Sequence, residues 1–372
     1  MKIIIIGNAD SGWVHTTIQN TIDLHSNEIY VLSYENKLYT TWYELNGVHV
    51  VLIPSYRVWK FKTWLASMLL RRNFRDLEFD LLIVHSVRKD YLIIAKHLMP
   101  QIKRKVAAFW GSDMFRADAR MIKTNKRYLE SYDGINITTD AMLEKFHEQY
   151  GTYFDEKINR ARFGLFALDN LDNHLSAQVS EAYFPEIPRN KVIVAIGYNG
   201  NQAQQHHAVL REIERLDKKL LSEMHLVLRM TYGTTKEYIE SVRNVLDTIP
   251  CTSTVLTDFF SDDESAALTC LTDVMIHAQT TDAMSAAILE HIYAGALVMN
   301  PTWISYRELE NENSCDVKYS SFEELGSLLP RFIKKKEEIL SPEDQEKHRR
   351  IVKEIASWEN NRRKWECLYY GK

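Results

Sequence analysis

The sequence predicts an α/β protein with two domains, each built on a parallel β-sheet with helices on both faces. The chain has 372 residues, which corresponds to about two domains at roughly 150 residues each. Short runs rich in Ile and Val recur along it without polar alternation, as in parallel strands that are covered on both faces. Helical stretches separate these runs, and a composition of 45% hydrophobic and 26% charged residues excludes the disordered and coiled-coil classes.

The apolar runs predict six strands in each domain. The first series covers residues 2–7, 29–34, 48–54, 80–85, 105–110 and 134–138, and the second covers 191–197, 225–230, 254–257, 273–278, 296–300 and 316–319. Asn, Asp and Pro are frequent at 167–190, which is therefore expected to be a linker. The expected organisation is a first domain at 1–166, a second domain at 191–342, and a charged helical tail at 343–372 that packs back on the first domain.

The charge balance and the cysteines narrow the class of protein further. Lys and Arg number 46 against 50 for Asp and Glu, and the net charge of -4 gives no general affinity for nucleic acid. The four cysteines have no CxxC spacing, which indicates neither a zinc site nor a disulfide framework and fits a reducing cytoplasm. The apolar start of the chain is too short for a signal peptide, and no run approaches the ~20 residues of a membrane-spanning helix. We therefore expect a cytoplasmic protein that is not integral to a membrane.

Ligands of such sheets bind beyond the carboxyl ends of the strands, so the loops after the strands carry the candidate residues. The loop after the first strand contains Asn8, Asp10 and His15 but no GxGxxG motif, which disfavours a nicotinamide cofactor. Asn8 and Asp10 are either turn residues or cleft-lining groups that hold a substrate hydroxyl. After the fifth strand, Asp113 either caps a helix or accepts the hydroxyl protons of a sugar, to which Trp110 offers a flat face.

The loops of the second domain carry a stronger signal for a phosphate group. A turn with Gly197, Asn199 and Gly200 leads into a helix near His206, and the exposed N–H groups and helix dipole of such a turn suit a diphosphate. The next strand ends with three further candidates, which are Arg229, Thr231 and Tyr232. The guanidinium of that arginine is either solvated or a phosphate partner.

The most specific pattern is an acidic residue, seven further residues and a glutamate. Asp282 lies in a loop at the cleft, and a helix is expected from Ser285, whose first-turn N–H groups can bind phosphate. Glu290 follows about two helical turns after Asp282, so the two carboxylates can contact distant parts of one extended ligand. The alternative interpretation is a helix cap at Asp282 and a solvated Glu290.

Taken together, these features resemble the GT-B glycosyltransferases of family 4 type. The resemblance consists of two Rossmann-like parallel-sheet domains facing across a cleft, the Gly-Ser-Asp turn at 111–113, and the acidic pattern that ends at Glu290 before a glycine and an apolar strand. The stretch 197–206, followed by 238–243, is also similar to the 4-acetamido-fucose transferases of family 56, which act on lipid-linked intermediates of enterobacterial common antigen. The architecture covers nearly the whole chain, whereas the motifs are strongest from about 191 to 303.

The resemblance implies a role for each candidate residue. Glu290 would hold the nucleotide ribose, Asp282 would contact the donor sugar, and Ser285 with its neighbouring N–H groups would hold the diphosphate. The implied catalytic set is Asp282, Asp113 and Arg229. The implied donor set is Gly197, Asn199, Gly200, His206, Thr231, Tyr232, Ser285 and Glu290, and the implied acceptor set is Asn8, Asp10, His15 and Trp110.

The sequence departs from the family pattern in three ways. Asp282 replaces the usual glutamate, and the Arg and Lys pair expected after the first strand of the second domain is missing. Trp110 stands where the family often has a histidine near the acceptor. Charge on the departing diphosphate would then be neutralised by Arg229, His206 and the helix dipole.

These inferences predict a glycosyltransferase of hexosyl type. It would move a sugar from a nucleotide diphosphate sugar to a lipid-linked or polysaccharide acceptor in bacterial surface glycan synthesis, with retention of configuration by analogy with family 4. The sequence contains no D-x-D triplet, so no metal is expected. No cofactor is expected either. Two alternatives stay open, namely a nucleotide-sugar epimerase or hydrolase of the same fold, and a noncatalytic sugar-binding protein.

Residues 57–75 carry a local excess of positive charge. The segment has six basic residues and no acidic one, a local charge of +6 within a chain of net charge -4. Its apolar positions recur at spacings of three and four, which predicts an amphipathic helix; they are Phe61, Trp64, Leu65, Met68 and Leu69. This face either packs on the first sheet or docks on an anionic membrane, and the tryptophans favour the second interpretation. We therefore expect peripheral attachment to the inner face of the cell membrane.

Overall fold

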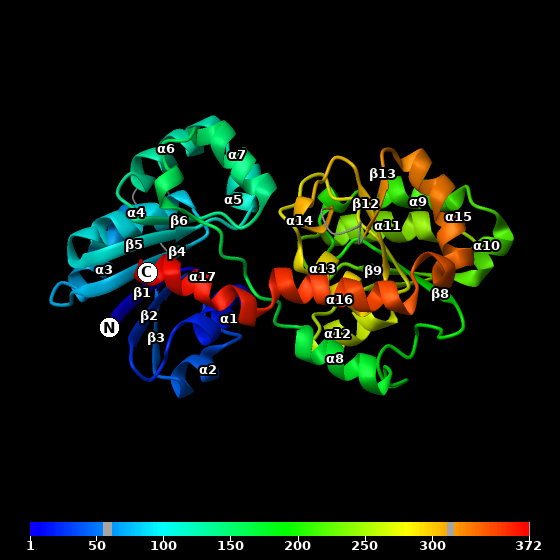
Figure 1. Cartoon of the computed structure of the whole chain (residues 1–372), viewed down its shortest axis with the longest axis horizontal. Coiled ribbons are helices and arrows are strands. Elements are labelled where there is room, and N and C mark those ends of the chain that lie inside the picture. The colour runs from blue at the N-terminus through cyan, green and yellow to red at the C-terminus, as the bar shows by residue number, and fades with distance from the viewer. Residues whose placement is uncertain (55–61, 311–315, 372) are drawn as a thin grey trace. The chain divides into compact units, whose positions relative to one another are not determined.

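The computed structural model describes residues 1–54, 62–310 and 316–371, and it divides the chain into two compact units (Figure 1). Unit 1 consists of Met1–Gly164 and Ala356–Lys372, and unit 2 consists of Leu165–Ile355. Each unit contains one sheet in which every strand pair is parallel, as the apolar runs predict. The α/β class with two Rossmann-like parallel-sheet domains is confirmed.

Unit 1 is built on a seven-stranded sheet of order β3-β2-β1-β4-β5-β6-β7. The strands are β1 (Lys2–Ile6), β2 (Glu28–Ser33), β3 (Val48–Leu52), β4 (Phe79–His85), β5 (Ile102–Ala108), β6 (Gly134–Asn136) and β7 (Ile158–Asn159). The helices are α1 (Gly12–Thr21), α2 (Thr40–Leu45), α3 (Lys62–Asn73), α4 (Lys89–Leu98), α5 (Ser112–Phe115), α6 (Ala119–Leu129), α7 (Asp140–Tyr150) and α17 (Trp358–Tyr370), with single 3₁₀ turns at Met99–Gln101 and Asp155–Lys157. All six predicted strands are present, and β7 is the addition, because two residues are too few to form an apolar run.

Unit 2 is built on a six-stranded sheet of order β10-β9-β8-β11-β12-β13. The strands are β8 (Val192–Ile196), β9 (Met224–Arg229), β10 (Thr252–Leu256), β11 (Val274–Ile276), β12 (Leu297–Pro301) and β13 (Asp316–Tyr319). The helices are α8 (Leu168–Ala177), α9 (His206–Glu214), α10 (Lys218–Glu223), α11 (Lys236–Leu246), α12 (Asp262–Leu271), α13 (Ala286–Ala294), α14 (Arg307–Glu310), α15 (Phe322–Ile339) and α16 (Pro342–Ala356), with a 3₁₀ turn at Gln202–Gln204. Each strand overlaps one predicted from the sequence.

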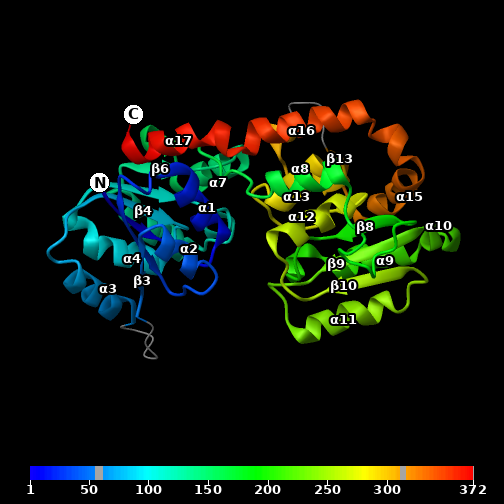
Figure 2. The ribbon, with the colours of Figure 1, turned by 90° about the horizontal axis from the view of Figure 1, so that it is seen from below.

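Helices cover both faces of the second sheet (Figure 2). One face packs against α9, α10, α11 and α15 in a continuous apolar core that includes Val209, Leu246 and Leu329. On the other face, Val227 of β9 packs with Leu268 of α12. Because both faces are covered, the polar groups that follow the strands gather at the carboxyl edge of the sheet.

The stretch expected to be a linker contains a helix instead. Residues 168–177 form α8, which belongs to unit 2 and buries Leu171. Asp172 on this helix accepts a hydrogen bond of 2.6 Å from the hydroxyl of Tyr293 on α13. The Asn and Asp residues that suggested a linker are the polar face of an amphipathic helix, whose leucines recur at 168, 171 and 175.

The C-terminal tail is divided between the two units. Helix α16 is part of unit 2 up to Ile355, whereas α17 packs on the first sheet with Trp365, Leu368 and Tyr369 in the apolar core of unit 1. The indole Nε1 of Trp365 donates a hydrogen bond of 2.6 Å to the backbone carbonyl of Arg162. Of the expected tail, residues 343–355 therefore belong to unit 2 and residues 356–372 to unit 1.

Candidate functional site

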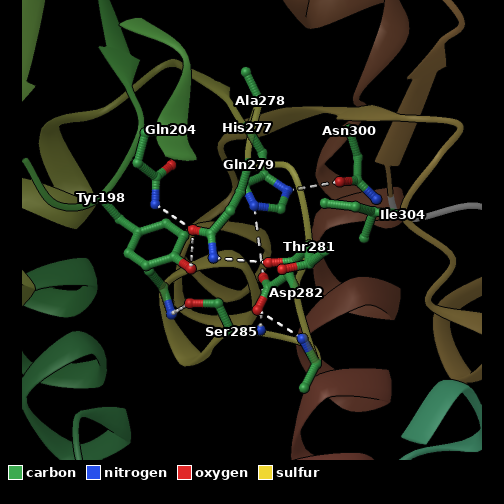
Figure 3. Close-up of polar contacts among 12 residues, drawn as sticks. Tyr198, Gln204, His277, Ala278, Gln279, Thr281, Asp282, Ser285, Asn300 and Ile304 are labelled. Carbon is green, nitrogen blue, oxygen red and sulfur yellow. Dashed lines mark hydrogen bonds and ion pairs between the residues drawn. The ribbon is translucent and has the colours of Figure 1, made fainter. Parts of the chain in front are cut away.

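A polar cluster lies at the carboxyl edge of the second sheet, where the loops after β8, β11 and β12 meet (Figure 3). Gln279, three residues beyond β11, accepts hydrogen bonds at Oε1 from the hydroxyl of Tyr198 at 2.7 Å and from the amide of Gln204 at 2.5 Å. Its own amide donates to the backbone carbonyl of Thr281 at 2.8 Å. Gln279 therefore connects the loop after β8 with the loop that carries Asp282.

The carboxylate of Asp282 accepts three hydrogen bonds and faces the ring of His277. Oδ1 accepts the backbone N–H of Ala283 at 2.8 Å, and Oδ2 accepts the backbone N–H of Ser285 at 3.2 Å. Oδ2 also accepts the hydroxyl of Tyr306 at 2.5 Å and lies 3.5 Å from Nε2 of His277. The side chain of Asp282 is only 10% exposed, so these contacts hold the carboxylate in place. Its hydrogen bonds to the backbone also close the turn that leads to Ser285.

Ser285 forms the N-cap of α13, as the sequence predicts for the start of this helix. Its hydroxyl oxygen accepts the backbone N–H of Ala287 at 3.3 Å. The remaining N–H groups of the first turn are at the positive end of the helix dipole, which favours an anion.

Glu290 and Arg229 line one small pocket together with Gly197, Tyr198 and His291. Burial raises the pKa of the Glu290 carboxyl to about 7, although the nearby charge of Arg229 opposes the shift. The guanidinium of Arg229 donates to the hydroxyl of Ser265 at 2.7 Å and lies 5.0 Å above the ring of Phe260. Because Tyr198 belongs both to this pocket and to the Gln279 cluster, it joins the regions of Glu290 and Asp282.

The turn after β8 brings its backbone close to buried polar side chains. Gly197 has a φ of +66°, and a Cβ there would lie 3.1 Å from Nε2 of His206 and 3.0 Å from Oε1 of Gln204, so only glycine fits easily. His206 is fully buried, which lowers the pKa of its imidazole to about 4, and its Nδ1 lies 3.1 Å from the hydroxyl of Tyr238.

Asn199 and Gly200 shape the same turn. The side chain of Asn199 accepts the backbone N–H of Asn201 at 2.9 Å, and the N–H of Gly200 donates to the carbonyl of Tyr232 at 2.9 Å. A Cβ at Gly200 would lie 2.5 Å from Cβ of Thr234. These contacts hold the loops after β8 and β9 against each other.

Three buried polar atoms near this turn have no hydrogen-bond partner among the described residues. They are Oε1 of Gln204, Nε2 of His206 and Oγ1 of Thr231. Burying such groups unpaired costs free energy, so a polar ligand or water at this edge would stabilise them.

Tyr232 is 46% exposed and stacks on Phe259, with ring centroids 6.5 Å apart.

The candidate residues of unit 1 have structural contacts of their own. The carboxylate of Asp10 accepts the backbone N–H groups of Lys37 and Leu38 at 2.6 and 2.8 Å, and Asn8 accepts the N–H of Asp10 at 3.1 Å. Asp10 thus fixes the loop after β2, while Asn8 is exposed. The ring of His15 stacks on Tyr39 with centroids 4.3 Å apart.

Trp110 and Asp113 follow β5. Trp110 packs edge-to-face on Phe163, with centroids 5.6 Å apart. The two carboxylate oxygens of Asp113 accept the backbone N–H groups of Val87 at 2.6 Å and Trp110 at 2.9 Å, and the residue is buried. Burial raises the pKa of this carboxyl, against the effect of those hydrogen bonds. These contacts tie the loops after β4 and β5 together, whereas the N-cap of α5 is Gly111, so Asp113 does not cap this helix. Its acceptor role stays a prediction.

The structure also brings in residues that sequence reasoning missed. His277, Gln279, Asn300 and Tyr306 all contact the Asp282 region directly or through one another, and none is in the predicted set. The first three lie within or just after apolar strands, where a polar residue interrupts the pattern. A polar residue in or just after an apolar strand is the sequence signal that could have found these three residues. Tyr306 has no such signal in the sequence.

Within residues 1–54, 62–310 and 316–371, no three His, Cys, Asp or Glu side chains converge on one possible metal position. No helix in the described part of the chain is both long enough and apolar enough to cross a membrane.

Comparison with solved structures identifies the fold. A glycosyltransferase from Rickettsia africae superimposes with a TM-score of 0.78 at 14% identity, covering 100% of this chain and 98% of the other. HepE of Anabaena in complex with UDP-glucose gives 0.74 at 11% identity over 99% of each chain, and the lipopolysaccharide glycosyltransferase WaaG gives 0.72 at 12% over 100% of each. The chain has the GT-B fold. No protein family model and no curated protein matches the sequence, so the GT-B likeness rests on structure alone.

Proposed function

We propose that the protein is a glycosyltransferase that transfers a sugar from a nucleotide diphosphate sugar, bound by unit 2, to an acceptor. The observation that carries the proposal is the arrangement of polar groups at the carboxyl edge of the second sheet. Two carboxylates, Asp282 and Glu290, flank the start of α13 there, next to buried polar atoms that have no partner among the described residues. The GT-B fold and the UDP-glucose held by HepE support this interpretation.

In this proposal, the parts of the donor bind along the edge of the sheet. The diphosphate binds the N–H groups of the first turn of α13, next to the Ser285 cap. Glu290 accepts hydrogen bonds from the ribose hydroxyls in the pocket, and Asp282 holds the donor sugar. Arg229 and the helix dipole offset the charge of the diphosphate.

The chemistry needs positioning and stabilisation of charge. The acceptor oxygen forms a bond to the anomeric carbon, the bond from that carbon to the diphosphate breaks, and the acceptor proton leaves with the diphosphate or with water. We propose retention of configuration and a hexosyl donor, with no metal required. In unit 1, Asn8, Asp10, His15, Trp110 and Asp113 remain the proposed acceptor residues.

For the acceptor, we propose a lipid-linked or polysaccharide glycan of the bacterial cell envelope. Helix α3 supports a membrane approach, because Trp64, Leu65 and Met68 are 51%, 38% and 47% exposed. Arg71 and Arg72 follow on the same helix and are exposed. The buried side of α3 consists of Ala66, Ser67 and Leu70, so much of the predicted apolar stripe lies on the outer side. Residues 57–61 of the basic segment that the sequence analysis identifies lie outside the described residues.

A ligand screen followed by a turnover assay tests the proposal. UDP, dTDP, GDP and CMP would each be added to the protein in a thermal-shift experiment, and one of them should raise the midpoint, because a ligand that binds only the native state stabilises it. The matching nucleotide sugar should then be consumed only when a glycan acceptor is added. Absence of any stabilisation by millimolar nucleotide would overturn the proposal. Conversion of the nucleotide sugar without acceptor would favour the epimerase or hydrolase instead.

A further inference from the structure

His277 is a buried histidine aimed at the carboxylate of Asp282 (Figure 3). It directly follows β11, its side chain is 0% exposed, and its Nε2 lies 3.5 Å from Oδ2 of Asp282. This distance is too long for a hydrogen bond, and Nε2 has no hydrogen-bond partner among the described residues. The two atoms face each other without a bond between them.

Linked hydrogen bonds through Asn300 and Asp316 determine which nitrogen of His277 carries the hydrogen. Lys318 forms an ion pair of 3.1 Å with Oδ2 of Asp316, and the same oxygen accepts the side-chain amide of Asn300 at 2.9 Å. A carboxylate can only accept, so the amide nitrogen of Asn300 faces Asp316 and its oxygen faces His277. That oxygen lies 2.7 Å from Nδ1 of His277, which must therefore donate.

This tautomer leaves a lone pair on Nε2 facing the carboxylate of Asp282. A neutral imidazole that donates from Nδ1 is an acceptor at Nε2, so two acceptors oppose each other at 3.5 Å. A proton on Nε2 would turn this contact into a charge-assisted hydrogen bond. Burial opposes that proton and lowers the pKa of His277, while the charge of Asp282 acts in the other direction.

The other ionisable groups around His277 come from several elements. Asp316 favours the protonated imidazole and Lys318 disfavours it. Three tyrosines also pack against the residue: the rings of Tyr198 and Tyr306 lie 5.9 and 6.2 Å away, and the hydroxyl of Tyr319 donates to the backbone carbonyl of His277. Burial raises the pKa of all three, so they stay neutral at physiological pH.

We propose that His277 is a positioning residue for Asp282, and that it takes up one proton on Nε2 from solvent when a nucleotide diphosphate sugar binds. The inference rests on the proposed function. The diphosphate adds negative charge at the start of α13, where the backbone N–H of Ser285 is already bonded to Asp282. Added negative charge favours the imidazolium, and the resulting hydrogen bond holds the carboxylate toward the donor sugar.

Nuclear magnetic resonance of the imidazole nitrogens tests this proposal directly. The full chain, labelled with ¹⁵N-histidine, would be observed at about pH 7.5 before and after saturation with UDP-glucose, or with whichever nucleotide sugar of the screen binds most tightly. The His277 signals are assigned by their loss in His277→Gln. The free protein should show a neutral ring protonated at Nδ1, and the complex should show a ring protonated at both nitrogens.

A matched control is present in the same spectrum. His225 is also buried in unit 2, but it lies at the amino end of β9, where its nitrogens contact the hydroxyls of Thr252 and Thr254 at 2.9 Å. Its signals should not change when ligand is added. A neutral His277 in the complex, or a free ring protonated at Nε2 alone, would overturn the inference while leaving the proposed function intact.

Binding measurements separate positioning from a purely structural role. His277→Gln should weaken binding of UDP-glucose by about tenfold and binding of UDP by a smaller factor. Both ligands carry the diphosphate that favours the imidazolium, but only UDP-glucose carries the sugar to which Asp282 is assigned. Equal weakening of both ligands would contradict this role, even if the variant is less stable. If no nucleotide or nucleotide sugar binds at all, the proposed function fails and this inference fails with it.

Discussion

Glu290 is a largely buried carboxyl whose neighbours only partly compensate its charge. Burial raises its pKa to about 7, and the charge of Arg229 in the same pocket opposes the shift. A carboxyl in such a position destabilises the free protein once it ionises, and it becomes favourable when a ligand supplies hydrogen-bond donors. Two predictions follow from this position, one for the free protein and one for the complex.

Replacing Glu290 with Gln should stabilise the free protein above neutral pH. The unfolded carboxyl loses its proton near pH 4.5 and the folded one near pH 7, so the wild type loses stability as the pH rises through this window. The variant does not, and its unfolding midpoint at pH 8 should be higher by at least roughly 2–4 °C. Scanning calorimetry of both proteins from pH 4 to 8 measures the difference, which should vanish toward pH 4. A variant less stable than wild type at pH 8 would contradict the prediction.

The same substitution should weaken nucleotide binding. The amide of Gln keeps the shape of the side chain but cannot be a charged acceptor for the ribose hydroxyls, and a charge-assisted hydrogen bond contributes about 1.5–3 kcal/mol. Affinity for UDP, or for the nucleotide selected by the screen, should fall by about tenfold or more at pH 8 in isothermal calorimetry. An unchanged dissociation constant would show that Glu290 does not hold the ribose.

Replacing Asp282 should affect the donor sugar, whereas replacing Asp113 should affect the acceptor. Asp282→Asn is expected to lower turnover while the affinity for free nucleotide stays within about threefold, because its contacts are assigned to the sugar. Asp113→Asn keeps only one acceptor oxygen and turns an NH2 group toward the second backbone N–H, so it should lower stability and act on the acceptor side only. Steady-state kinetics with separate nucleotide-binding measurements distinguish the two. Loss of nucleotide binding in a folded Asp113 variant would show that the assignment to units is wrong.

At the scale of elements, helix α3 offers apolar and basic side chains to solvent. Removing two cations that face an anionic membrane should cost about 2 kcal/mol of binding, or roughly thirtyfold in partitioning at low salt. We therefore expect Arg71→Ser with Arg72→Ser to leave most of the protein in the supernatant when it is sedimented with anionic liposomes. Wild-type binding should weaken with added salt.

A charge-matched control checks that the effect belongs to α3. Lys218 and Lys219 are exposed on α10 of unit 2, and their replacement by Ser removes the same charge. This variant should sediment as the wild type does. If the wild type itself stays in the supernatant with anionic liposomes at low salt, the membrane proposal is wrong.

At the scale of the whole molecule, the C-terminal helix completes the first unit. Trp365 on α17 is 0% exposed and packs in the core formed by β1, β4 and β5. Trp365→Ala should destabilise unit 1 by about 3–5 kcal/mol, because a large cavity opens in a closely packed core. Hydrogen exchange of unit 1, followed by mass spectrometry, measures the loss. Trp64→Ala is the matched control, since Trp64 is 51% exposed and should cost less than about 1 kcal/mol. Equal effects of the two substitutions would contradict the assigned role of α17.

The sequence by itself determined the strands and the edge at which the candidate site lies. Runs such as 191–197 and 273–278 are local signals, because a buried parallel strand must be apolar at nearly every position. The spacing of Asp282 and Glu290 relative to the start of a helix is equally local, and α13 begins where this spacing predicts, just after Ser285. A helix in place of the expected linker was missed, because polar residues on its outer face resemble turn residues.

Only the tertiary structure decided which polar groups bond to one another. The contact between Asp282 and Tyr306 spans 24 residues, and the Asn300 amide reaches Asp316 because β12 and β13 are neighbours in the sheet. Helix α17 returns to unit 1 with Trp365 bonded to a carbonyl 203 residues earlier. Which face of α3 is buried was likewise decided by its packing in unit 1. Hydrophobic periodicity is a property of consecutive residues, whereas pairing of buried polar groups depends on which strands become neighbours, and a single sequence does not encode that order locally.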